Sequence, residues 1–174
     1  FFEARSLLDG GEFVKQFRDY FIYENTGILI TGVGPEKTKK TLEKHRPRPR
    51  CALNIGLCGA LNALQPGEVF NPAAIVSRDE LQISNTIFPL LVTVKNPVES
   101  SARFFEEAGW QNPEGAMAAD MEGAVLQAYF EPLQIPLKVI KIVSDAGKED
   151  FEAHFKERKE LLLKKLADVA RSQL

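Results

Sequence analysis

The sequence predicts a single α/β domain over residues 1–174, a three-layer sandwich with a mixed, mostly parallel central sheet. The first observation behind this prediction is that short apolar segments alternate with segments of helical periodicity, as in strand–helix units that share one sheet. The second is the length of 174 residues, which is the size of one domain. The third is that no internal repeat, linker or low-complexity stretch divides the chain.

The first elements are expected to follow one another closely. Apolar residues at helical spacing run through residues 4–17. Strands are expected at residues 20–23 and 28–31, with a turn between them. A polar helix is expected at residues 36–45, because the prolines that follow cannot continue it. Since the chain opens on Phe1 rather than on a methionine, we expect part of a first strand to precede it.

The rest of the chain continues the alternation of strands and helices. Residues 137–143 are the clearest apolar segment and are expected to form a buried strand. A long closing helix is expected from Phe151 to Val169, because apolar residues mark one face and charged residues the other. The remaining expected elements are strands at 52–55, 73–77, 90–94 and 116–119 and helices at 97–108 and 124–130.

The charge balance argues against nucleic-acid and membrane partners. The chain has 22 Lys and Arg residues against 24 Asp and Glu residues, a net charge of −2, which leaves no broad positive surface for a polyanion. Arg46, Arg48 and Arg50 alternate with prolines, a pattern that favours a solvated loop over a basic patch. No apolar run approaches the roughly 18 residues that a membrane span requires.

Few residues are suited to metal binding or cross-linking. The chain has two cysteines, Cys51 and Cys58, and two histidines, His45 and His154. The two cysteines are seven residues apart and form no CxxC motif, so the spacing does not indicate a Cys/His zinc site. Two cysteines are also too few for a disulfide framework. A chain without such a framework is typical of a reducing compartment such as the cytoplasm.

Two glycine-rich segments follow expected strands. Gly32-Val-Gly34-Pro-Glu-Lys37 resembles a dinucleotide-binding fingerprint, but its third glycine is replaced by Lys37, and the carboxylate of Glu36 would repel a phosphate. A strand-to-helix turn is therefore favoured there over a ligand loop. Gly56-Leu-Cys-Gly59 is either a tight turn or a place where backbone amides approach a ligand closely.

Carboxylates at strand ends are the best candidates for chemistry. Asp145 follows Ser144 at the end of the clearest apolar strand, where it is either a proton donor or an N-cap of the closing helix. Asp120 and Glu122 lie at a strand-to-helix junction, where they either accept hydrogen bonds from vicinal hydroxyls or stabilise the helix end. Glu3 is either a partly desolvated base or an exposed residue.

Taken together and in this order, these segments resemble the nucleoside phosphorylase/nucleosidase superfamily, in particular its nucleosidase branch. That branch includes methylthioadenosine/S-adenosylhomocysteine nucleosidase and futalosine hydrolase. The Met-Glu and Ser-Asp pairs, some twenty residues apart, are the most specific elements. The segments that carry the resemblance are Glu3-Ala-Arg-Ser-Leu-Leu8, Thr31-Gly-Val-Gly34, Asn54-Ile-Gly-Leu-Cys-Gly-Ala60, Pro66-Gly-Glu-Val69, Asp120-Met-Glu-Gly-Ala124 and Val139-Ile-Lys-Ile-Val-Ser-Asp-Ala146.

The resemblance implies a role for each matching residue. Asp145 would protonate N7 of a departing purine, and Glu122 would hold the 2′ and 3′ hydroxyls of the ribose with Met121 packed against the sugar. Glu3 would orient or deprotonate the attacking water. The resemblance further implies a homo-oligomer and a reaction that needs no metal or organic cofactor. The other residues implied to contact the nucleoside are Gly56, Leu57 and Ser144.

Three positions depart from the pattern of the superfamily. Its phosphorylases read Arg-Val-Gly-Ser-Cys-Gly at the glycine segment, whereas this chain has Asn54 and Leu57 at the arginine and serine positions. A phosphate would lose two partners there, which favours water as the nucleophile. Lys141 replaces a frequent arginine and is a possible anion contact. The sequence therefore predicts a purine nucleosidase, with a phosphorylase or a non-catalytic nucleoside-binding or storage protein as alternatives.

Overall fold

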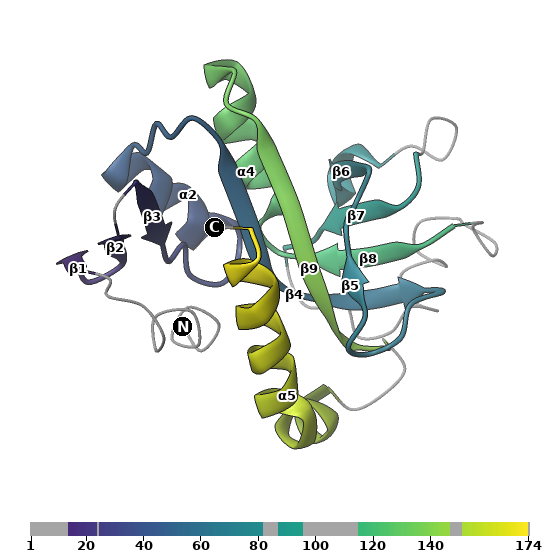
Figure 1. Ribbon diagram of the computed structural model, residues 1–174. Coiled ribbons are helices and arrows are strands. Elements are labelled where there is room, and N and C mark those ends of the chain that lie inside the picture. The colour runs from purple at the N-terminus through teal and green to yellow at the C-terminus, as the bar shows by residue number, and fades with distance from the viewer. Residues whose placement is uncertain (1–13, 24, 82–86, 96–114, 147–150, 174) are drawn as a thin grey trace.

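The computed structural model describes residues 14–23, 25–81, 87–95, 115–146 and 151–173, and the statements that follow concern these residues (Figure 1). A six-stranded sheet forms the centre, and a three-stranded antiparallel sheet lies beside it. The strands of the central sheet, in spatial order, are β5 (Val69–Phe70), β9 (Leu137–Asp145), β4 (Ala52–Asn62), β8 (Met117–Asp120), β7 (Leu90–Thr93) and β6 (Ala74–Ser77).

The central sheet is mixed, as the sequence predicts. β4 and β9 run parallel, and so do β6 with β7 and β7 with β8. β5 is antiparallel to β9, and β4 is antiparallel to β8. Parallel pairs therefore outnumber antiparallel ones, which confirms the predicted fold class.

Helices cover both faces of this sheet, so the predicted three layers are present. On one face, Leu162 and Leu166 of α5 pack against Ile142 of β9. On the other face, Leu126 of α4 packs with Leu42 of α2. Within the described ranges, no helix is both long enough and apolar enough to cross a bilayer. The helical elements are α2 (Pro35–His45), η1 (Arg78–Glu80), α4 (Gly123–Phe130), η3 (Glu131–Leu133) and α5 (Phe151–Arg171).

Strand β4 is longer than the predicted strand at 52–55, and it excludes the tight-turn alternative for residues 56–59. The strand continues to Asn62, so Gly56 and Gly59 lie within the ladder rather than in a loop. The reason is that β4 has partners along its whole length, with Leu53 opposite Lys138 on β9 and Ala60 opposite Ala118 on β8. These partners satisfy the backbone groups of the small residues, and the extended conformation is then favoured over a turn.

The N-terminal part of the chain departs from the prediction in one respect. The apolar spacing of residues 4–17 indicates a helix, but Val14–Phe17 form strand β1, which pairs antiparallel with β2 (Tyr20–Tyr23). Residues 4–13 of that segment lie outside the described residues. The neighbouring strand supplies backbone hydrogen bonds that a short segment cannot supply alone, and pairing overrides local periodicity. β3 (Thr26–Leu29) begins two residues earlier than expected. The predicted helix at 97–108 lies outside the described residues.

Candidate active site

The carboxyl ends of β8 and β9 meet at Gly59 of β4. β9 pairs with residues 52–59 of β4 and β8 with residues 59–62, in opposite directions. Gly59 is consequently opposite Ala119 on β8 and opposite Asp145 on β9. Because neighbouring strands lie about 4.8 Å apart, these two partners are about 10 Å from each other. The fold thus brings the Asp-Met-Glu segment that ends β8 close to the Ser-Asp segment that ends β9.

Strand β9 carries a bulge at Ser144. Cys58 pairs with Val143, whereas the next residue of β4, Gly59, pairs with Asp145, so Ser144 is the extra residue. A bulge changes the direction of side chains and is frequent beside active sites. A Cβ atom on Gly59 would lie 3.3 Å from Oδ2 of Asp145, so the glycine leaves room for the carboxyl group.

The Ser144 hydroxyl lies between two acceptors. Its Oγ is 2.6 Å from Oδ1 of Asp145 and 3.0 Å from the backbone oxygen of Cys58. Ser144 is 3% exposed, whereas Asp145 is half-buried. The alternative that Asp145 is an N-cap of the closing helix is wrong, because α5 begins only at Phe151.

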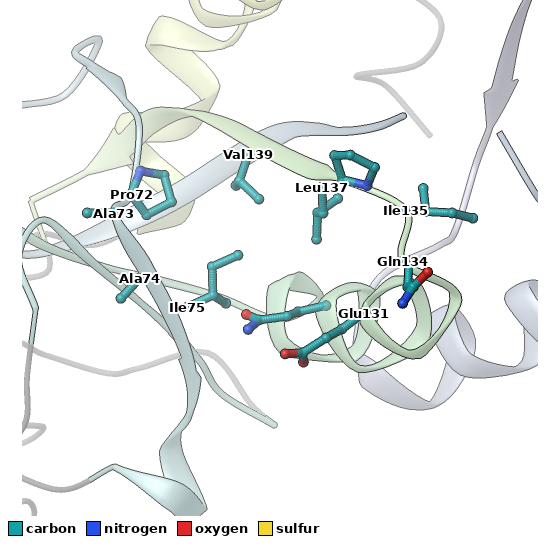
Figure 2. Close-up of a pocket in the computed structure, with 11 residues that line it drawn as sticks. Pro72, Ala73, Ala74, Ile75, Glu131, Gln134, Ile135, Leu137 and Val139 are labelled. Atoms are coloured by element: carbon teal, nitrogen blue, oxygen red, sulfur yellow. The ribbon is translucent and has the colours of Figure 1, made fainter. Parts of the chain in front are cut away.

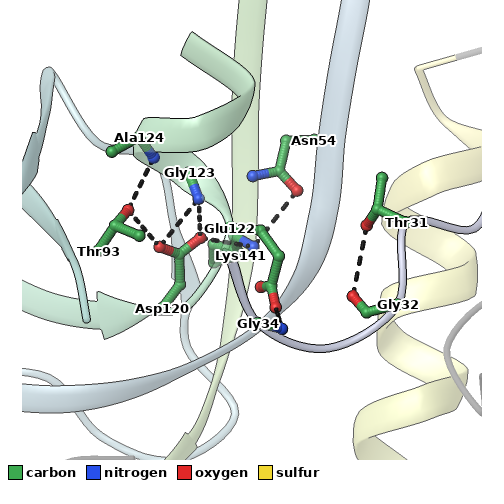
Figure 3. Close-up of polar contacts among 10 residues, drawn as sticks. All are labelled: Thr31, Gly32, Gly34, Asn54, Thr93, Asp120, Glu122, Gly123, Ala124 and Lys141. Carbon is green, nitrogen blue, oxygen red and sulfur yellow. Dashed lines mark hydrogen bonds and ion pairs between the residues drawn. The ribbon is translucent and has the colours of Figure 1, made fainter. Parts of the chain in front are cut away.

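Asp120 is the centre of a buried polar cluster (Figure 3). Its carboxylate accepts hydrogen bonds from Oγ1 of Thr93 at 2.8 Å and from the backbone nitrogen of Gly123 at 3.0 and 3.1 Å. The Thr93 hydroxyl in turn accepts a hydrogen bond from the backbone nitrogen of Ala124 at 2.7 Å. These contacts satisfy backbone amides in the first turn of α4, which otherwise lack partners. The expectation that Asp120 stabilises a helix end is confirmed.

Lys141 completes this cluster from β9. Its Nζ lies 3.0 Å from Oδ2 of Asp120 and 3.3 Å from Oδ1 of Asn54, and its side chain is 2% exposed. Burial by itself lowers the pKa of Lys141, but the negative charges of Asp120 and Glu122 outweigh burial and raise the pKa above its ordinary value. The ammonium group is therefore charged and is directed at an internal carboxylate. Among the described residues, Nδ2 of Asn54 has no hydrogen-bond partner.

Glu122 connects two parts of the chain that lie far apart in sequence. Its Oε1 accepts a hydrogen bond from the backbone nitrogen of Gly34 at 2.8 Å (Figure 3). Gly34 has a φ of 91° and is the N-cap of α2, so the segment is a strand-to-helix turn, as predicted. A Cβ atom on Gly34 would lie 3.4 Å from Cε of Met121. Glu122 is the N-cap residue of α4, so its charge lies at the positive end of that helix, as the helix-stabilising alternative expects.

The structure gathers some of the predicted site residues and separates others. Met121, Glu122, Ser144 and Asp145 lie around the carboxyl ends of β8 and β9. Leu57 instead packs into the apolar cluster beneath α5, on the opposite face of β4 from the Lys141 contact with Asn54. Gly56 lies within the ladder opposite Lys141, and Glu3 lies outside the described residues.

Sequence reasoning missed the contribution of Thr93. Nothing distinguishes a threonine at the end of an ordinary apolar strand, and its two hydrogen bonds become visible only once β7 and β8 are paired.

Cys58 also lies at this site, and burial raises the pKa of its thiol well above the usual range. The thiol is therefore neutral and unsuited to act as a nucleophile. Among the described residues, no group of three potential ligands could hold a metal ion.

A cavity of about 470 Å³ lies where β9 begins (Figure 2). Asp145 is at the other end of this strand. Leu137 and Val139 of β9 line one side of it, and Gln127 and Glu131 line another. None of the residues that line it belongs to the Asp-Met-Glu or Ser-Asp segments. The cavity has the volume of a small-molecule pocket, but neither Asp145 nor Glu122 is among the residues that line it.

The fold is the one found in nucleosidases of the nucleoside phosphorylase/nucleosidase class, so the resemblance seen in the motifs is confirmed at the level of the fold. The chain is similar to the MTAN nucleosidase of Chlamydia trachomatis bound to adenine, with a TM-score of 0.78 and 20% identity over 98% of this chain and 91% of that one. An aspartate-to-asparagine variant of Helicobacter pylori MTAN with 5′-methylthioadenosine in its active site gives a TM-score of 0.73 at 16% identity, over 98% and 93%. A futalosine hydrolase mutant of Helicobacter pylori gives a TM-score of 0.71 at 16% identity, over 98% of this chain and 93% of that one. The sequence matches no family model, and no curated protein sequence matches it.

Proposed function

We propose that the protein is a nucleosidase that hydrolyses the N-glycosidic bond of a purine nucleoside or thionucleoside. The observation that carries the proposal is the meeting of two strand ends at Gly59, which places Glu122 and Asp145 around one region of the sheet. The likeness of the fold to nucleosidases that hold adenine or 5′-methylthioadenosine supports it.

In the proposed reaction, Asp145 gives a proton to N7 of the purine while the bond between C1′ and N9 breaks. The bonding electron pair stays with the base, which leaves as a neutral purine. Glu122 accepts hydrogen bonds from the 2′ and 3′ hydroxyls, which helps the sugar to develop oxocarbenium character. Water adds to C1′, and Glu3 takes its proton, a role that rests on the resemblance. No step requires a metal ion or organic cofactor.

Water is proposed as the nucleophile because the described residues offer a phosphate dianion little. Lys141 is already paired with Asp120 and hydrogen-bonded to Asn54 in the interior. The side chain of Leu57 has no polar group and packs beneath α5. A phosphate would have to break the buried ion pair to gain a cationic partner, and leaving Asp120 unpaired would be costly.

The test is base release from a panel of purine nucleosides, including adenosine, inosine and 5′-methylthioadenosine, with and without inorganic phosphate. We expect free base in phosphate-free buffer and no stimulation by phosphate. Release only with phosphate would establish the phosphorylase alternative. If adenine raises the melting temperature but no substrate turns over, the protein is a nucleoside-binding relative. The predicted homo-oligomer can be measured in the same preparation by analytical ultracentrifugation, and the cytoplasmic location stays a prediction.

A further inference from the structure

The single hydroxyl proton of Ser144 has two acceptors within reach. The backbone oxygen of Cys58, 3.0 Å away, can only accept a hydrogen bond. Oδ1 of Asp145, 2.6 Å away, accepts one when the carboxyl group is ionised. One proton makes only one short and nearly linear hydrogen bond at a time. If the hydroxyl donates to Cys58, the 2.6 Å contact is a hydrogen bond only when Asp145 carries a proton on that oxygen.

The bulge in β9 creates this arrangement. Because Ser144 is the extra residue between two rungs, the regular ladder between β4 and β9 is interrupted at Cys58. The Ser144 hydroxyl supplies a donor to the Cys58 carbonyl at that interruption. The same bulge places the Ser144 hydroxyl beside the carboxyl group of the next residue. Burial of Ser144 keeps solvent from competing for either contact.

We propose that Ser144 is a positioning residue whose hydroxyl changes acceptor as Asp145 loses its proton. The inference rests on the proposed nucleosidase activity and gives Ser144 a role other than the substrate contact expected from its motif. While Asp145 is protonated, the hydroxyl donates to the Cys58 carbonyl. Once Asp145 is ionised, the hydroxyl turns by rotation about its C–O bond and donates to Oδ1 of Asp145.

The change of acceptor accompanies the proton transfer, and it requires no further proton donor or acceptor. The proton that Asp145 holds on Oδ1 leaves its hydrogen bond to the Ser144 oxygen and moves to N7 of the purine, and the electron pair of the C1′–N9 bond leaves with the base. Ser144 keeps its own proton throughout and redirects it toward the new negative charge. A hydrogen bond to an ionised group is stronger than one to a neutral group. The contact therefore stabilises Asp145 most after it has given up its proton, and so lowers the barrier to that transfer.

The test compares two leaving groups in Ser144→Ala. A purine nucleoside needs a proton on its base to leave, whereas 4-nitrophenyl β-D-ribofuranoside releases a phenolate that needs none. We expect Ser144→Ala to lower kcat for the purine nucleoside by about 10- to 100-fold, the range set by losing one hydrogen bond to a charged group. The kcat for the nitrophenyl riboside should stay within about twofold of the wild type, and KM should change little for either substrate.

Two further variants keep the outcome decisive. Ser144→Thr retains a hydroxyl and should recover most of the purine activity. Ser172→Ala removes an exposed hydroxyl that likewise bonds a backbone carbonyl, that of Val169 at 2.7 Å, and should leave both substrates unaffected. Equal losses on both substrates in Ser144→Ala, or no loss on the purine, would overturn the role of Ser144 alone. If Ser144→Ala does not fold, Ser144→Thr provides the test. A Ser144→Thr variant with as little activity on the purine nucleoside as Asp145→Asn would also overturn the role of Ser144. A wild type that releases neither leaving group would overturn the proposed function itself.

Discussion

Asp120 and Glu122 lie two residues apart at the junction of β8 and α4, yet their surroundings differ. Asp120 is 4% exposed and receives hydrogen bonds from Thr93 and Gly123 and an ion pair from Lys141. Glu122 is half-buried and accepts a hydrogen bond from the backbone nitrogen of Gly34 in a turn at the start of another helix. One carboxylate is enclosed by its partners, and the other remains within reach of solvent.

The difference separates two tasks on one short segment. A buried charge with a full set of donors holds strands and helices together, and exchanging its partners for a ligand would leave a charge unpaired. A half-buried carboxylate can gain a ligand without exposing a buried charge. Changes around Asp120 should therefore affect stability first, whereas changes at Glu122 and Asp145 should affect turnover first.

The largest effect is expected for Asp145→Asn on turnover. An asparagine keeps the shape and can still contact Ser144, but it cannot donate a carboxyl proton. General-acid catalysis contributes about 10²- to 10⁴-fold, so kcat for purine release should fall by that factor while the melting temperature changes little. Asp168→Asn, at an exposed carboxylate on α5, is the matched control. Unchanged turnover in Asp145→Asn would contradict the proton-donor role.

The next largest effect is expected for Lys141→Met on stability. The variant leaves Asp120 as a buried charge without its cation, which typically costs about 3–5 kcal/mol. The measurement is the free energy of unfolding in urea. Lys138→Met removes an exposed lysine from the same strand and should cost less than about 1 kcal/mol. Similar losses of unfolding free energy in the two variants would show that the buried ion pair contributes no more to stability than an exposed lysine does.

Much of the fold could be predicted because it depends on local pattern. The strand at 137–143 and the closing helix appear in the apolar periodicity, and both are present as β9 and α5. The extension of β4 through its glycines could not be predicted, since it depends on pairing with two different strands. Two glycines close together favour a turn by themselves, and the long-range hydrogen bonds that hold them in a strand cannot be seen in the sequence.

The candidate site shows the same limit. The Asp-Met-Glu and Ser-Asp segments stand out in the sequence because carboxylates follow apolar strands. The direction in which each side chain points cannot be seen in the sequence. Lys141, for example, pairs with Asp120 rather than with an anion from solvent. Leu57 was expected at the sugar and packs beneath α5, because an uninterrupted strand alternates its side chains between the two faces. The bulge at Ser144 leaves no mark in the sequence.

A moderate effect is expected for Glu122→Gln on substrate selectivity. Glutamine can still accept the hydrogen bond from Gly34, so the fold should persist, but the negative charge that would bind the ribose hydroxyls is lost. The value of kcat/KM for ribosides should fall by about 10- to 100-fold, which corresponds to one charged hydrogen bond. The value for 2′-deoxyribosides should fall much less. Equal losses would argue against a hydroxyl clamp, and Glu160→Gln on α5 serves as the control.

A smaller effect is expected from alkaline pH. The pKa of Lys141 is raised above the ordinary 10.5, so its contribution to stability is present below that pH and is lost as the pH rises toward the folded-state pKa. Above about pH 10.5, the stability difference between wild type and Lys141→Met should shrink by about 1.4 kcal/mol per pH unit. A difference that stays constant in this range would mean that Lys141 is not charged in the fold.

The smallest effect is expected at a second Asp–Lys pair, which lies at the surface. Asp19 contacts Nζ of Lys44 at 2.9 Å and Nε2 of His45 at 2.9 Å, and the Lys44 side chain is 57% exposed. The hydrogen bond from Lys44 lowers the pKa of Asp19 below 3.8. Its contribution is therefore present above that pH and is lost as the pH falls through the lowered value. Asp19→Asn should cost less than about 1 kcal/mol at neutral pH, and less still at high salt. A loss as large as that of Lys141→Met would show that burial is not what separates the two pairs.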